Sequence, residues 1–374
     1  MNRFPDNKRF AFTIHDDTDL STVENVHPIY NLLTELGLHT TKSVWPLASV
    51  PDGWHGGSSL QDPEYLRFIL DLQDRGFEIA LHGVRNHDAT REAVKKGLEE
   101  FRRLIGYNPR IHANHSRNAE NIYWGDARFN KLRRLYRIAT VLGNTRKFEG
   151  HTPESPYFWG DLCQDKIDYV RNFVFREVNL NRINPTMPYR DPLRPFVKYW
   201  FSSCYGPDAT SFCETLSESN QEQLEAEGGV CIMYTHFASG FVREGKIKPR
   251  AEYLLRRMAQ RPGWFVPVSI PQHSTIAVIH GRAIDTAACI LPVTALSAAT
   301  AMILRTPTAP PSSSPSTSGG ISGSCIHKFS LSVPTSSKGF RSRLPYVAIE
   351  VSTPLSRTSF SMRVHPDSTG KTIL

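Results

Sequence analysis

Apolar and polar positions follow two alternating patterns over residues 1–270. Short apolar runs, of the kind that form buried strands, are separated by segments in which apolar residues recur every three or four positions, as in amphipathic helices. The clearest helical patterns lie between the first four runs and around 249–260. The apolar runs occupy residues 10–14, 41–47, 77–84, 110–116, 229–236 and 264–269.

Residue types that favour helix termini stand at the start of three helical patterns. Ser21 and Glu24 have the spacing of a capping box, Asp62 precedes a proline at the first helical position, and Thr90 comes directly before the third pattern. These signals predict where the first three helices begin.

Strands that alternate with helices indicate an α/β protein with a parallel sheet. Titratable residues gather where the apolar runs end, with a His-Asp-Asp sequence after the first run and histidines at the end of later ones. A (β/α) barrel would place these residues on the rim that carries active sites, and an open doubly wound sheet would place them at its corresponding edge. The pattern predicts the fold class and leaves barrel closure open.

Two adjacent carboxylates, Asp16 and Asp17, end the first run. Two carboxylates cannot both stay ionised in a dry site at low cost, so one is expected to bind a cation while the other handles protons. The structural alternative is a polar strand end at which Asp17 caps a turn. His15 alternates to the opposite side of the strand from Asp16, which favours a packing or supporting role.

Histidines on the same rim complete a candidate metal site. His82 ends the third run, His87 follows five residues later, and His112 and His115 close the fourth run. Imidazoles combined with a carboxylate suit Zn²⁺ or a similar divalent ion, whereas each histidine taken alone is explained as well by local packing. His236, at the end of a late run, is a candidate general acid or base because imidazole titrates near neutral pH.

Charge distinguishes the body of the chain from its last hundred residues. The 374-residue chain has a net charge of +8, and residues 271–374 contribute +6 of it through nine basic and three acidic residues. The remaining +2 over residues 1–270 provides no electrostatic footprint for a nucleic acid. We therefore predict a catalytic domain at 1–270 and a basic Ser/Thr/Pro-rich tail at 271–374, which is either disordered or the product of a frameshift.

No segment predicts a membrane anchor or a secretory signal. The uncharged stretch 286–304 approaches the length of a bilayer span, but its Ala, Ser, Thr and Pro content makes it weakly hydrophobic. The amino terminus has no apolar run of the signal type, so a cytoplasmic location is expected. The six cysteines form no CxxC pair, which favours reduced thiols over a cysteine metal site.

Residues 1–270 resemble the polysaccharide deacetylase superfamily, that is, carbohydrate esterase family four and its divergent bacterial relatives. The resemblance depends on three strand ends in the same order: Thr-Ile-His-Asp-Asp at 13–17, Gly-Phe-Glu-Ile-Ala-Leu-His at 76–82 and Tyr-Thr-His at 234–236. It implies a distorted (β/α) barrel that hydrolyses N- or O-acetyl groups on sugars, usually with a divalent metal.

The resemblance also implies a role for each matching residue. Asp16 becomes the general base that activates water, Asp17 a metal ligand, His82 the first histidine ligand, and His236 the general acid that protonates the leaving group. A divalent metal, most simply Zn²⁺, would polarise the acyl carbonyl and stabilise the oxyanion.

Two features of the family pattern need reassignment in this chain. The second motif of the family places its histidines four residues apart, whereas His82 and His87 are five apart, so His115 is the alternative third ligand. The family also tends to pair an arginine with an aspartate that orients the base, and Arg117 and Asp161 are the matching candidates.

The sequence therefore predicts a metal-dependent hydrolase that removes an acyl group from an amide or ester on a sugar-like substrate. Two alternatives stay open: a metal-independent amidohydrolase that uses Asp16 and His236 alone, and a barrel that binds carbohydrate without catalysis. Activity that resists chelators would indicate the first alternative, and saturable sugar binding without turnover would indicate the second.

Overall fold

The computed structural model describes residues 4–115, 117–129 and 147–269, together with three strands near the carboxyl terminus. The chain divides into two compact units, residues 1–304 and 305–374. The predicted domain boundary at 271, the uncharged stretch 286–304 and most of the predicted tail lie outside the described residues. The second unit contains an antiparallel sheet of β11 (Ile326–Lys328), β12 (Val347–Ser352) and β13 (Ser359–Val364).

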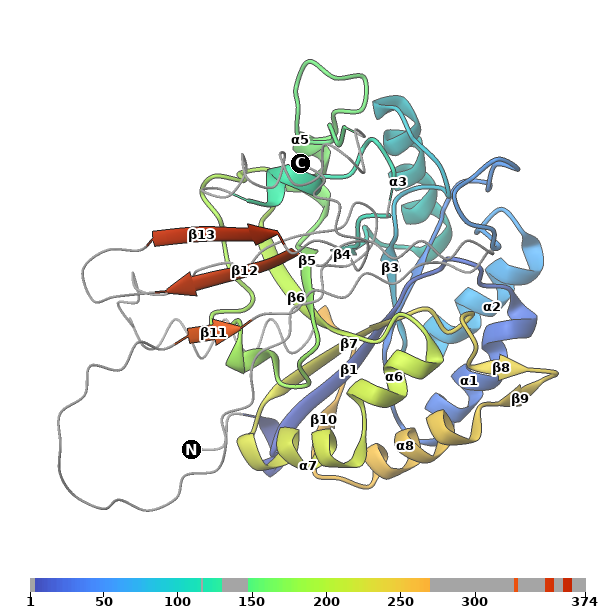
Figure 1. Cartoon of the computed structure of the whole chain (residues 1–374). Coiled ribbons are helices and arrows are strands. Elements are labelled where there is room, and N and C mark those ends of the chain that lie inside the picture. The colour runs from blue at the N-terminus through green and yellow to red at the C-terminus, as the bar shows by residue number, and fades with distance from the viewer. Residues whose placement is uncertain are drawn as a thin grey trace, which may run out of the picture. The chain divides into compact units, whose positions relative to one another are not determined.

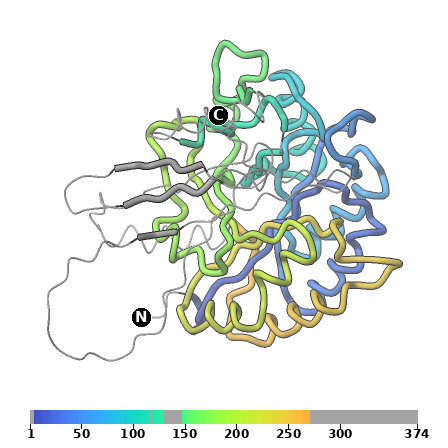
Figure 2. The backbone as a smooth tube through the Cα atoms, in the orientation of Figure 1, coloured from blue at the N-terminus to red at the C-terminus, as the bar shows by residue number. Residues whose placement is uncertain are grey.

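The first unit contains a closed barrel of seven parallel strands (Figure 1). The hydrogen-bonded order runs from β1 to β7, and β7 then pairs with β1, which lies beside it in the backbone trace of Figure 2. This closure confirms the predicted (β/α) barrel over the open sheet. The strands are β1 (Phe10–Asp16), β2 (Thr41–Val44), β3 (Glu78–Leu81), β4 (Ile111–His112), β5 (Tyr169–Phe175), β6 (Tyr199–Tyr205) and β7 (Val230–Thr235).

An additional strand, β10 (Gly263–Phe265), distorts the barrel. It pairs with the first half of β1, whereas β2 pairs with β1 only at His15 and Asp16. Since β7 occupies the other edge of β1 along almost its whole length, β10 and β2 share one edge. At the end of the barrel where the strands begin, β10 therefore lies between β1 and β2.

The segment after β10 fills this amino end of the barrel. The backbone N–H of Val268 donates to Thr41 Oγ1 (2.9 Å), and the N–H of Ser269 donates to Glu78 Oε2 (3.2 Å). Burial raises the pKa of the Glu78 carboxyl, as expected for an acid inside a packed plug. The titratable groups that follow the strands gather at the opposite end, where the strands finish.

Helices cover the outer face of the barrel, with α1, α2 and α3 along one side in Figure 1 and α6, α7 and α8 along another. Their apolar stripes pack against the strands and form the hydrophobic core, to which Leu33, Ile69, Phe101 and Leu254 contribute fully buried side chains. The helices are α1 (Val23–Glu35), α2 (Pro63–Asp74), α3 (Arg91–Ile105), α5 (Gly160–Lys166), α6 (Ala209–Thr215), α7 (Glu218–Glu227) and α8 (Pro249–Ala259).

Smaller elements connect these helices and strands. A hairpin of two-residue strands, β8 (Val242–Arg243) and β9 (Lys246–Ile247), precedes α8. Single turns of 3₁₀ helix occur at η1 (Pro5–Asn7), η2 (Gly125–Arg128) and η3 (Leu180–Arg182). Among the described helices, none combines the length and the apolar character needed to cross a bilayer.

The start of α1 differs by one residue from the sequence expectation. Thr22, rather than Ser21, is the N-cap: its Oγ1 accepts from the N–H of Asn25 (3.4 Å), and the Asn25 side chain accepts from the N–H of Thr22 (2.9 Å). Ser21 is buried, and its hydroxyl accepts from Lys42 Nζ (3.0 Å) instead. A tertiary partner thus decides which of two adjacent hydroxyls caps the helix. The second and third helices begin after the predicted caps.

The sequence patterns did not predict β5, β6 or the helices α5 to α7 around them. Both strands carry polar side chains toward the barrel interior, including Arg171 on β5 and Ser203 on β6, which pair in register with apolar neighbours. A polar interior position interrupts the apolar run that marks a buried strand. The interruption is informative, since one of these residues belongs to the site.

Candidate active site

Alternation along β1 sends neighbouring carboxylates to opposite faces of the barrel wall. Asp17 follows the strand on the interior face, where Arg171 of β5 reaches it from across the barrel. Asp16 faces outward, toward Tyr30 of α1. Because successive side chains of a strand point to opposite sides, these two carboxylates do not meet in one site.

Asp16 is buried within a cluster between the barrel and its helices. Its Oδ2 accepts from Lys42 Nζ (2.8 Å) and from the Tyr30 hydroxyl (2.9 Å), and its Oδ1 accepts from the N–H of Phe237 (2.8 Å). Burial by itself would lower the pKa of Lys42, but the neighbouring Asp16 outweighs burial and raises this pKa above its usual value. Lys42 is therefore charged. Because this carboxylate lies on the outer face of the barrel wall, away from the interior rim, its position does not support the general-base role expected for Asp16.

Asp17 forms a buried bidentate ion pair with Arg171. Nη1 of the guanidinium donates to Oδ1 (2.9 Å), Nη2 donates to Oδ2, and His15 Nδ1 lies 3.0 Å from Oδ1. The guanidinium also lies over the ring of Tyr234, 4.5 Å from its centroid. Burial raises the pKa of Asp17, but Arg171 and His82 outweigh it and hold the pKa well below its usual range. Asp17 is therefore an ionised carboxylate in a fixed orientation.

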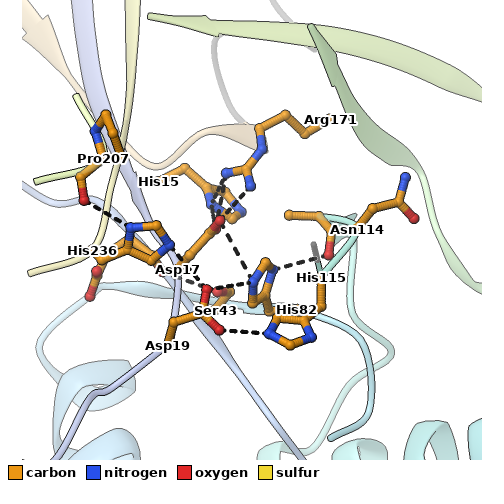
Figure 3. Close-up of polar contacts among 12 residues, drawn as sticks. His15, Asp17, Asp19, Ser43, His82, Asn114, His115, Arg171, Pro207 and His236 are labelled. Carbon is orange, nitrogen blue, oxygen red and sulfur yellow. Dashed lines mark hydrogen bonds and ion pairs between the residues drawn. The ribbon is translucent and has the colours of Figure 1, made fainter. Parts of the chain in front are cut away.

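Three imidazoles lie against the carboxylate of Asp19, which is two residues beyond Asp17 in the chain. Figure 3 shows its carboxylate with His236 on one side and with His82 and His115 on the other. The Nε2 of His236 lies 3.0 Å from Oδ2, the Nε2 of His82 lies 3.4 Å from Oδ2, and the Nε2 of His115 lies 2.8 Å from Oδ1. These histidines follow β7, β3 and β4, so the closed barrel brings together groups that are far apart in sequence.

The far nitrogen of each imidazole is held by an oxygen acceptor. Nδ1 of His82 lies 3.1 Å from the Ala113 carbonyl, and Nδ1 of His236 lies 2.8 Å from the Pro207 carbonyl. A carbonyl can only accept, so both Nδ1 atoms carry hydrogen, and in a neutral ring the Nε2 lone pair then faces Asp19. His115 Nδ1 lies 3.0 Å from Asn118 Oδ1, an arrangement of the same kind. Such outer partners orient the histidine ligands of metal sites.

The donor set at Asp19 fits a divalent cation. Lone pairs of neutral imidazoles repel a carboxylate unless a proton or a cation lies between them. Asp19 Oδ1 and His115 Nε2 are buried and have no aligned hydrogen-bond partner among the described residues. Asp19, His115 and His55 can each offer one ligand atom, all within 4.8 Å of one another. One carboxylate oxygen with imidazole nitrogens is a donor set that suits Zn²⁺ and related ions.

At this rim, attraction between the carboxylate and its neighbouring imidazoles outweighs burial in setting the pKa values. Burial raises the pKa of Asp19, but His115 and His82 outweigh it and hold this pKa well below its usual range. Burial lowers the pKa of His236, yet its hydrogen bond to Asp19 raises it to about 9. Without a metal, His236 is thus protonated at neutral pH and can act as a proton donor.

Three residues named from the sequence lie elsewhere or pair differently. Asp161, at the start of α5, forms its bidentate ion pair with Arg91 (2.6 and 2.7 Å) at the surface. Arg117 lies in a turn beyond β4, and the arginine that holds an aspartate at the rim is Arg171. The imidazole of His87 stacks on the indole of Trp54, with ring centroids 4.5 Å apart.

Sequence reasoning missed Asp19, Arg171 and His55. The sequence contained a signal for Asp19. If the chain stays extended beyond the strand, a carboxylate two residues after Asp17 points to the same side as Asp17. Arg171 had none, since an arginine inside a strand pattern looks like an exposed edge position. His55 stands in a Gly-Trp-His-Gly-Gly sequence, and a histidine flanked by glycines in a loop is a weak indication by itself.

Comparisons with known proteins find similar folds among solved structures. A protein from Mycobacterium smegmatis, provisionally assigned as a polysaccharide deacetylase, matches over 74% of this chain and 93% of its own, with 14% identity and a TM-score of 0.42. Peptidoglycan deacetylase PdaC from Bacillus subtilis matches over 72% of this chain and 93% of its own, with 10% identity and a TM-score of 0.38. No protein-family model and no curated protein matches the chain.

Proposed function

We propose that the chain is a divergent polysaccharide deacetylase-like hydrolase that removes an acyl group from an amide or ester on a sugar-like substrate, with a divalent metal. The observation that carries this proposal is the Asp19 carboxylate enclosed by imidazole Nε2 atoms, next to the ionised Asp17–Arg171 pair. Hydrolysis of an acyl bond with a metal requires ligands for the ion and a carboxylate base held beside them, and both are present at this rim.

The proposed metal ligands are Asp19, His82 and His115, so Asp19 takes the ligand role first given to Asp17. These side chains come from three different strand ends, and hydrogen bonds to their Nδ1 atoms orient both imidazoles. A divalent ion held there would polarise the acyl carbonyl and lower the pKa of a water molecule. Zn²⁺ is the preferred candidate, because two of the three ligands are imidazoles.

Proton transfers are assigned to residues on either side of this ligand set. Asp17 accepts a proton from the attacking water, and Arg171 keeps its carboxylate aimed at the rim. His236 donates a proton from Nε2 to the leaving amine or alcohol, since its Nδ1 is already engaged by the Pro207 carbonyl. Asp16 and Asp161 have no part in this scheme, and neither does the pairing of Arg117 with Asp161.

One observation favours a second candidate, the metal-independent amidohydrolase. The contact between His236 and Asp19 is complete without a cation, because a protonated imidazole with a pKa of about 9 is itself the positive partner. In that scheme Asp17 and His236 transfer protons alone, and the other imidazoles only support Asp19.

Metal analysis of the purified full chain separates these candidates. We expect one equivalent of a divalent ion per chain, and we expect hydrolysis of 4-nitrophenyl acetate and of N-acetylated sugars that chelation abolishes and Zn²⁺ restores. His82→Ala should lose the ion and the activity, whereas His27→Ala, an exposed residue on α1, should keep both. Activity without stoichiometric metal would favour the second candidate. Saturable sugar binding with no turnover of any acyl substrate would contradict both.

A further inference from the structure

The loop between β2 and α2 places an additional histidine at the rim. His55 stands in the glycine-rich sequence 53–57, and its ring meets that of His115 nearly at right angles, with centroids 5.6 Å apart. One of its ring nitrogens belongs to the group of ligand atoms, with Asp19 and His115, that lie within 4.8 Å of one another. His55 therefore approaches Asp19 from the loop side, whereas His82 and His236 approach it from strand ends.

Hydrogen bonds tie this loop to the segment that carries His82. The side chain of Asn86 accepts from the N–H of Val50 (2.8 Å), and its Nδ2 donates to the carbonyls of Val50 (3.1 Å) and His55 (2.9 Å). The N–H of Trp54 donates to the Asn86 carbonyl (3.0 Å). One asparagine thus holds the loop at two positions, Val50 and His55, and it fixes the backbone of His55 itself.

The loop is also tied to the segment that carries Asp19. The N–H of Leu20 donates to the Gly56 carbonyl (2.7 Å), and a Cβ atom on Gly57 would lie 3.1 Å from the Leu20 nitrogen. Gly57 has φ of 131°, a backbone conformation that favours glycine. Gly53 packs so closely on Asn86 that a Cβ atom there would lie 2.0 Å from its amide nitrogen. These glycines allow the loop to approach both segments, so the position of His55 is built into the fold.

We propose that His55 is a further protein ligand of the divalent ion, supplied by the β2–α2 loop to the set formed by Asp19, His82 and His115. This inference rests on the proposed function, because it concerns the same ion. A third imidazole makes the donor set richer in nitrogen, which strengthens binding of Zn²⁺ and Co²⁺ far more than that of Mn²⁺ or Mg²⁺. His55 would thereby act as a determinant of metal selectivity.

The test compares metal binding by the full chain and its variants, with no substrate present. Zn²⁺ affinity is measured by competition with a chromophoric chelator, and Co²⁺ binding is followed by visible absorption. We expect His55→Gln to weaken Zn²⁺ binding about ten- to a hundredfold and to shift the Co²⁺ absorption, with a much smaller change for Mn²⁺. His27→Gln is the matched surface control and should leave all three measurements unchanged.

The outcomes separate this inference from the proposed function. If the wild-type chain binds Zn²⁺ and His55→Gln binds it equally well with an unchanged Co²⁺ spectrum, His55 is not a ligand, although the metal-dependent hydrolase stands. If the wild-type chain binds no divalent ion, both fail together. Imidazole ¹⁵N NMR of the Zn²⁺-loaded wild-type chain gives an answer that needs no variant, since a His55 nitrogen must shift on ligation if the inference is correct.

Discussion

Two buried clusters, each centred on an aspartate, lie on opposite faces of the barrel wall at the end of β1. On the outer face, Asp16 is enclosed by Lys42, the Tyr30 hydroxyl and a backbone N–H, and each of its oxygens has a donor. On the inner face, Asp19 Oδ1 and His115 Nε2 are buried 2.8 Å from each other, but neither has an aligned hydrogen-bond partner among the described residues. Burial and charge are common to both clusters, and hydrogen-bond satisfaction is what distinguishes them.

This difference indicates what each cluster does. A fully satisfied buried ion pair holds elements together, and removing one partner leaves an uncompensated charge. Buried polar atoms without partners persist where the surrounding fold fixes them, and they are concentrated at sites that receive a ligand. The outer cluster thus holds β1, β2 and α1 together, whereas the inner cluster offers the atoms on which the proposed metal site rests.

The largest expected effect compares one carboxylate from each face. Asp19→Asn should lower kcat/KM by about a thousandfold, because several kcal/mol of transition-state stabilisation depend on the metal. Asp16→Asn should cost about tenfold, since it acts only through the Phe237 N–H beside His236. Steady-state hydrolysis of 4-nitrophenyl acetate by folded protein measures both. Equal losses in the two variants would erase the distinction between the faces.

For the free energy of unfolding, substitutions in the outer cluster should cost more than substitutions in the inner cluster. Lys42→Met leaves the Asp16 carboxylate buried without its cation and should lower the free energy of unfolding by about 3–5 kcal/mol in urea titrations. Adding Asp16→Asn to this variant should recover much of the loss, because the remaining pair is neutral. Zn²⁺ affinity should stay near the wild-type value in the double variant. Loss of Zn²⁺ binding there would mean that the outer cluster shapes the site directly.

Two buried histidines, His112 and His236, should respond to pH with opposite signs in the metal-free protein. Burial lowers the pKa of His112, which packs against Trp159, to about 3. The unfolded chain therefore takes up a proton that the folded chain refuses, so stability is lost as pH falls below about 6.5, by at most about 1.4 kcal/mol per pH unit. His112→Gln should remove this acid-side slope, measured as unfolding free energy against pH.

His236 provides the opposite case. Its folded pKa of about 9 lies above the unfolded value, so its contribution is fully present below about pH 6.5 and is lost as pH rises toward 9. His236→Gln should flatten this alkaline slope, measured as unfolding free energy against pH. An alkaline slope that stays the same in this variant would contradict the assignment.

The smallest effect is expected at Asp161, outside both clusters. Its ion pair with Arg91 is about half exposed, and such surface pairs contribute about 0–1 kcal/mol. Asp161→Asn should leave kcat unchanged and shift the unfolding midpoint only slightly. A large loss of activity would restore the role that the sequence resemblance implied for this residue.

The alternation of strands and helices was sufficient to predict the α/β class, because period-2 and period-3.6 patterns report directly which side of an element is buried. It left barrel closure open, and only the family resemblance implied a barrel. It was not sufficient for β5 and β6, since Arg171 and Ser203 point into a polar interior and interrupt their apolar runs. The rim histidines His82, His115 and His236 were found by their places at strand ends. Asp161 and Arg117 were paired by family likeness alone, and Asp161 pairs with Arg91 instead.

The sequence by itself determined the class of fold, the edge at which the chemistry gathers, and the residue types available there. Only the tertiary structure decided which carboxylate meets the histidines. Asp16 and Asp17 are neighbours in the chain, but the pleat of β1 sends one to Lys42 and the other to Arg171. Barrel closure then brings side chains from distant strand ends to Asp19. Local patterns encode which way a side chain points, and closure of the barrel determines what it meets there.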